Sequence, residues 1–141
     1  MVVLQIKDTE FELKFSVALD RKLNKDIKTD NDSKTKDKLT GGISKVLNDL
    51  LDMDIEALAR VFKSAIDIAP KERSVKASVE EIMDAIEERM DEDGDAVKIF
   101  SEVFAAIDES AFTRNELQKF VKNMSLVKYM RSKDIDPRTA V

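Results

Sequence analysis

The chain of 141 residues contains no cysteine, no histidine and no tryptophan. Without cysteine it can form neither a disulfide framework nor a thiolate metal site, which fits a reducing compartment. Without histidine it lacks the side chain whose unperturbed pKa lies nearest neutrality, so acid–base catalysis would need a tuned carboxylate or lysine. These absences argue against an enzyme, and we expect no catalytic residues, no cofactor and no bound metal.

Long apolar runs are missing as well. No segment approaches the roughly 18 consecutive apolar residues that span a bilayer, and no signal peptide precedes the first predicted strand. We therefore expect a soluble protein that is not exported and has no membrane partner. The length suits one domain with a core of its own.

Charge is unevenly distributed along the chain, whose formal net charge is −5. Residues 1–53 carry ten basic and ten acidic side chains, residues 54–112 carry seven and sixteen, and residues 113–141 carry seven and three. An acidic middle would repel phosphate, so we expect no nucleic-acid partner. The basic end is either a solvated tail or a contact for an acidic protein surface.

Residues 2–15 alternate apolar and polar side chains, as strands with one buried face do. The apolar positions are Val2, Leu4, Ile6, Phe11, Leu13 and Phe15. A polar turn over residues 8–10 divides them into two strands. Because an isolated two-stranded hairpin is marginal in water, its apolar face must pack on the helices that follow.

Apolar side chains at helical spacing predict helices through the rest of the chain. The expected helices cover 16–25, 43–51, 54–69, 78–93 and 95–107, with a last one from Thr113. The fold class is therefore mainly α: a small bundle of five to six helices with an N-terminal β-hairpin packed on it. We assign residues 1–125 to this domain, about 26–41 to a mobile polar loop, and 126–141 to a basic, flexible tail.

Two of these helices are more apolar than a surface helix requires. Apolar positions cover roughly 200° of the helical wheel in 54–69 and roughly half of it in 95–107, so these two should pack side by side at the centre. Capping boxes are expected at Ser78–Glu81 and at Thr113–Glu116, and the second would start a new helix after a bend.

Four acidic residues have the spacing of an EF-hand calcium loop. They are Asp91, Asp93, Asp95 and Glu102. Ala96 stands where that loop needs a glycine for its sharp turn, so we interpret the segment as a helix end at Gly94 followed by a new helix. Residues 40–42, Thr-Gly-Gly before a helix, could bind an anion, but they lack the lysine of a phosphate loop and we interpret them as a hinge.

The order of these segments resembles one protein family. The opening Thr9–Phe15 (TEFELKF), followed by Leu23-Asn24-Lys25, Gly42 before a short apolar helix, and the helix from Met53, is similar to tail assembly chaperones of long-tailed phages and prophages of Gram-positive bacteria. The resemblance covers roughly residues 1–125. The charged loop 26–41 and the long C-terminal part depart from it.

The resemblance implies a non-enzymatic assembly factor. Such chaperones bind the long helical tape measure protein in the host cytoplasm, keep it soluble until tube subunits polymerise around it, and are absent from the mature virion. Further implied partners are the tail tube protein and a frameshift-extended form of the chain itself, and we expect a homo-oligomer. The alternatives are an adaptor or inhibitor that sequesters an amphipathic helix of another protein, and a calcium-responsive module.

The chain contains seven phenylalanines and six methionines. These apolar side chains suit either the core of the protein or a groove that binds a helix of another protein. The residues that we predict to contact the partner are Phe62, Met83, Met90, Phe100, Phe104, Phe112, Phe120 and Met124.

Overall fold

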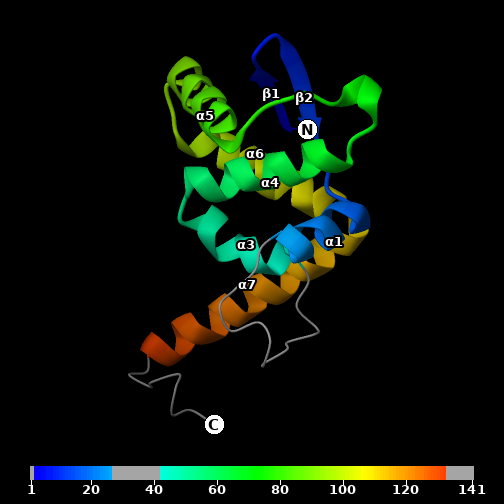
Figure 1. Cartoon of the computed structure of the whole chain (residues 1–141). Coiled ribbons are helices and arrows are strands. Elements are labelled where there is room, and N and C mark those ends of the chain that lie inside the picture. Colours follow the sequence, from blue (N-terminus) through cyan, green and yellow to red (C-terminus); the bar gives the residue numbers. More distant parts are fainter. Residues whose placement is uncertain (1, 27–41, 133–141) are drawn as a thin grey trace.

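The computed structural model describes residues 2–26 and 42–132, with side chains as far as residue 122. Within these ranges the protein is mainly α, with six α-helices and one two-stranded sheet, which confirms the predicted fold class. The hairpin lies at one end and α7 projects from the other (Figure 1). The predicted mobile loop beyond residue 26 and the tail from residue 133 lie outside the described residues.

The N-terminal hairpin consists of β1 (Val2–Ile6) and β2 (Thr9–Leu13), paired antiparallel. A two-residue turn at positions 7–8 joins them, so the turn is shorter than the predicted 8–10. The alternation holds in both strands, and every apolar residue of one face is buried. The hairpin therefore contributes one apolar face to the core, as its period of two predicted.

Helices α1 (Val17–Asp26) and α3 (Gly42–Leu51) pack against each other. The Asp20 carboxylate accepts the Ile43 backbone N–H at 2.8 Å, so the amino end of α3 is already occupied by an anion from the same chain. Gly42 is buried against the α1 backbone. The hinge interpretation is therefore wrong for this residue, which is a packing glycine.

Helix α4 (Ile55–Ile68) occupies the centre and packs against α1, α3 and α5. Asp54 caps it by accepting the Ala57 N–H, and the extended Ala69 before Pro70 ends it, both as predicted.

The end of α1 is tied to α4 through Asp26, whose carboxylate accepts the Ser64 hydroxyl at 2.7 Å and the Lys22 ammonium at 3.0 Å. Burial raises the pKa of Asp26, but the hydrogen bonds from Ser64 and Lys22 outweigh it, so the net pKa is lowered. A lowered folded-state pKa stabilises the protein above the unfolded pKa, and this stability is lost as the pH falls through the folded pKa.

We therefore expect Asp26→Asn to lower the urea midpoint at about pH 7. The gap to the wild type should be smaller at about pH 3, below the unfolded-state pKa of about 3.9, because the stability that a lowered pKa contributes declines there. Urea unfolding at both pH values checks this. The exposed Asp52 provides the control, Asp52→Asn, which should leave the midpoint nearly unchanged at both. A constant gap between Asp26→Asn and wild type would contradict the linkage.

Helices α5 (Val79–Asp93) and α6 (Val97–Glu109) follow a short 3₁₀ helix, η1 (Lys71–Arg73). The Ser78–Glu81 capping box is present, and Gly94 ends α5 in the left-handed region at φ 67°, as predicted. The main neighbours of α6 are α5, α7 and β1, so it does not pack side by side with α4 as expected.

Helix α7 (Ala111–Ser132) begins two residues before the predicted start. The Thr113 hydroxyl donates to the Ile107 carbonyl oxygen at 2.7 Å, and the Glu116 carboxylate accepts the Ser44 hydroxyl at 2.6 Å. The second capping box is therefore wrong, because both side chains bond to other elements. The helix continues to residue 132, into the segment that we expected to be a flexible tail.

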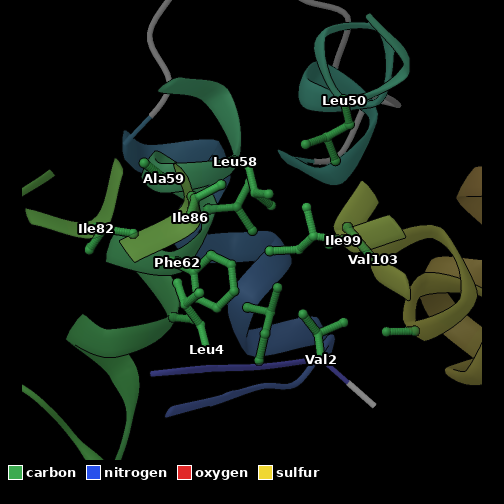
Figure 2. Close-up of a cluster of buried hydrophobic side chains, with 14 of the residues drawn as sticks. Val2, Leu4, Leu50, Leu58, Ala59, Phe62, Ile82, Ile86, Ile99 and Val103 are labelled. Atoms are coloured by element: carbon green, nitrogen blue, oxygen red, sulfur yellow. The ribbon is translucent and has the colours of Figure 1, made fainter. Parts of the chain in front are cut away.

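The core lies where the hairpin, α4, α5 and α6 meet (Figure 2). Leu4 of β1 approaches Phe62 of α4, while Ile99 and Val103 of α6 enter from the other side. Phe11 of β2 places its ring edge-on to Phe62, with the ring centroids 6.3 Å apart. The hairpin is thus stabilised by the helices, and it covers apolar area that would otherwise face solvent.

Candidate partner-binding surfaces

The predicted contact residues divide between the core and the surface. Phe62 and Phe100 are buried within the chain's own core, so the folded protein offers neither of them to a partner. Phe112 is 39 % exposed. The side chain of Met124 lies outside the described residues. The remaining predicted residues are partly buried against the core: Met83, Met90, Phe104 and Phe120.

The wide apolar stripes of α4 and α6 are largely used by the fold itself. Their central residues are buried, and their clearly exposed large apolar side chains are at helix ends, Ile68 in α4 and Val97 in α6. A trough along the middle of these helices, which the sequence suggested, is therefore not present. Any surplus apolar area lies elsewhere.

One such area lies on α7. At 100° per residue, its apolar positions from 112 to 121 span about half of the helix circumference. The centre of this span, at Thr113 and Glu116, is buried against the body. We call the four partly or largely exposed apolar residues of this span the α7 apolar face: Phe112, Leu117, Phe120 and Val121. Its borders are open, with Phe112 39 % and Val121 51 % exposed.

A groove of about 590 Å³ lies between β2 and the carboxyl end of α4. We call it the edge groove. The strand contributes Glu10 and Glu12 to its lining, and Lys14 follows directly after the strand. The opposite side is formed by residues 65–73, of which Ile68 is 40 % exposed. None of the residues predicted from the sequence lines this groove.

The edge groove has only a faint signal in the sequence. The apolar stripe of α4 continues through Ile68 and Ala69 up to Pro70, past the point where the helix can be covered by its neighbours. The position of the strand edge beside it depends on how the hairpin is docked, which no local pattern specifies.

The other edge of the hairpin is covered by Arg89 of α5. Its Nη2 donates to the Glu102 carboxylate at 2.7 Å, its Nε to Asp93 at 3.0 Å, and its Nη1 to the Val3 carbonyl oxygen at 3.2 Å. The Glu102 hydrogen bond raises the pKa of Arg89 against the effect of burial, and Asp93 adds to it. This guanidinium therefore joins β1, α5 and α6 as a fixed cation.

The calcium-like spacing is explained by these contacts. Asp93 pairs with Arg89, and Asp95 accepts the Val97 N–H at the start of α6. Within residues 2–26 and 42–132, no group of three or more acidic residues is arranged to hold a metal ion. In the same part of the chain no helix combines the length and apolar character needed to cross a bilayer.

Comparison with known protein families gives a match over most of the chain. A sequence model of the family described as phage tail assembly chaperone protein, TAC, matches residues 3–122. No curated protein and no solved structure matches the chain. The matched range includes all of the hairpin except Val2, the edge groove and the α7 apolar face.

Proposed function

Because this chain belongs to the phage tail assembly chaperone family, we propose that it binds the tape measure protein and keeps it soluble while the tail tube assembles. It acts without catalysis in the cytoplasm of a Gram-positive host, in the assembly of a long-tailed phage or prophage. It is released before the virion is mature.

The observation that carries this proposal is the α7 apolar face. A tape measure is a long amphipathic helix, and a second helix binds such a stripe by laying residues at i, i+3, i+4 and i+7 against it. Phe112 and Val121 lie on either side of the contact between α7 and the rest of the protein, so a client helix could pack along either side. Such contacts would hide the client's apolar side chains from other clients.

Charge supports the same arrangement. Around its apolar face α7 carries Arg114, Lys119 and Lys122, all exposed, whereas α5 presents an acidic outer surface. Basic residues beside an apolar stripe favour client segments with acidic flanks. The acidic remainder of the surface keeps the complex soluble through its net charge.

A long client also favours several copies of the chaperone. Binding many segments of one chain through weak sites that act together raises the overall affinity without new contacts. We therefore propose a homo-oligomer along the tape measure. The tail tube protein and a frameshift-extended form of the chain would join it later in assembly.

Co-expression with the tape measure protein from the same genome tests the proposal. We expect the wild type to move the client into the soluble fraction, and Phe112→Ser combined with Val121→Ser to lower that fraction at least fivefold, because the client loses its apolar anchors. Both residues are already exposed, so the fold should tolerate the change. Quantitative blotting of soluble and insoluble client measures the effect.

Val97→Ser is the matched control, since Val97 is 49 % exposed but stands at the opposite end of α6 from α7. It should behave as the wild type. Client solubility that does not depend on the presence of this protein would refute the proposal. If peptides tiled from the tape measure all fail to bind while an amphipathic helix of another protein binds, the adaptor or inhibitor replaces the chaperone.

A further inference from the structure

We propose that the edge groove is a second docking site, distinct from the α7 apolar face, in which one extended segment of a partner protein adds to β2 as a third strand. The segment has apolar residues at alternate positions and basic residues opposite Glu10 and Glu12. This site takes an extended chain, whereas the α7 apolar face takes a helix.

The backbone of β2 offers the hydrogen bonds. Ile6 and Thr9 flank the two-residue turn, so they form a hydrogen-bonded pair, and the next pair, Gln5 opposite Glu10, does not. Continuing this alternation along β2, Glu10 and Glu12 direct their N–H and C=O groups away from β1. Within the described part of the chain, no backbone group outside the hairpin bonds to either of them.

The contact at the opposite edge supports this pattern. Val3 pairs with Glu12, so its carbonyl must also point outward from the hairpin, and it accepts the Arg89 guanidinium there. Helix α5 covers that edge. Of the two edges of the sheet, the β2 edge is therefore the one left open to pair with another chain.

The size of the groove limits its occupant to one strand. A volume of about 590 Å³ spread along the five residues of β2, about 17 Å in length, leaves a cross-section of about 35 Å². One strand in a sheet occupies roughly 4.8 Å by 10 Å, so the groove encloses most of the cross-section of one strand and leaves the rest of it facing solvent. A second copy of the hairpin would bring two strands and need about twice that area. One extended segment therefore matches the groove better than a hairpin does.

The side chains around the groove select its sequence. Ala65, Ile68 and Ala69 offer an apolar surface to alternate residues of an added strand. The exposed side chains of β2 are Thr9, Glu10 and Glu12, and residues directly opposite the two glutamates are favoured when basic. Lys14 disfavours a third basic residue at the end of the segment.

A synthetic hexapeptide of alternating lysine and valine tests the site with the full-length protein. We expect it to bind in fluorescence anisotropy and to slow hydrogen exchange at the Glu10 and Glu12 amides. The same peptide N-methylated at alternate residues should bind at least tenfold more weakly, since it cannot donate the ladder hydrogen bonds. A peptide of alternating glutamate and valine should also bind at least tenfold more weakly than the lysine–valine peptide, because its glutamates lie opposite Glu10 and Glu12 and repel them.

Ile68→Asp should reduce binding of the lysine–valine peptide at least tenfold, and Val97→Asp, at an apolar position outside the groove that is at least as exposed, should not. Equal affinity of the N-methylated peptide, or full binding to Ile68→Asp, would overturn the proposal. Protection of the same amides by raising the concentration of the protein alone would assign the groove to a second copy and reject a partner segment. No tape measure protein is present in these assays, so their failure leaves the co-expression result intact.

Discussion

Gly42→Ala should be the most destabilising glycine substitution in the described part of the chain. A Cβ atom at this position would lie 2.3 Å from the Asp20 carbonyl oxygen and 2.5 Å from the Asn24 amide nitrogen. Both are backbone atoms of α1 and cannot rotate away. Helix α3 would therefore have to shift away from α1, which would lengthen the hydrogen bond from the Ile43 N–H to the Asp20 carboxylate. We expect a loss of about 3 kcal/mol in the free energy of unfolding.

Gly94→Ala separates this packing effect from ordinary backbone strain. Gly94 has φ 67° but nothing within 4 Å of an added Cβ, so alanine there meets strain without a clash. The expected loss is about 1 kcal/mol. Urea unfolding of both variants measures the difference, with one slope m of the unfolding free energy against urea concentration used for both. Equal losses would show that α1 and α3 can separate freely, contrary to the close approach at Gly42.

Local signals predicted the elements well because their physics is local. The alternation in β1 and β2, the Asp54 cap and the Ser78–Glu81 capping box need only neighbouring residues, and all are present. Thr113–Glu116 has the same spacing as Ser78–Glu81 but a different outcome. The Glu116 carboxylate accepts a hydrogen bond from the Ser44 hydroxyl, 72 positions away in sequence, and this tertiary hydrogen bond replaces the local one of a capping box.

The contact surface was harder to predict because burial is decided by packing between elements. Phe62 and Phe112 are the same residue type on apolar helical faces, yet one is fully buried and the other is exposed. Phe62 is covered because the hairpin docks over α4, which the wheel of α4 does not reveal. The edge groove depends on a further choice, the docking of α5 on β1 rather than on β2.

Arg89→Met should give the second large loss of stability. Methionine retains much of the aliphatic packing of arginine but removes the charge and all three of its hydrogen bonds. The side chains of Asp93 and Glu102 are 13 % and 29 % exposed, so they would remain largely desolvated without their main cation. We expect a loss of about 2–3 kcal/mol, somewhat below that of a fully buried pair. Urea unfolding at about pH 7 measures it.

Arg60→Met is the control, because Arg60 pairs with Glu56 in a solvent-exposed i,i+4 bridge and should lose less than about 0.5 kcal/mol. Adding Glu102→Gln to Arg89→Met tests the cause. If the loss comes from a stranded carboxylate, removing its charge should restore part of the stability, and the double-mutant cycle should show coupling of about 1 kcal/mol or more. Strictly additive losses would mean that the loss does not come from the pairing of Arg89 with Glu102.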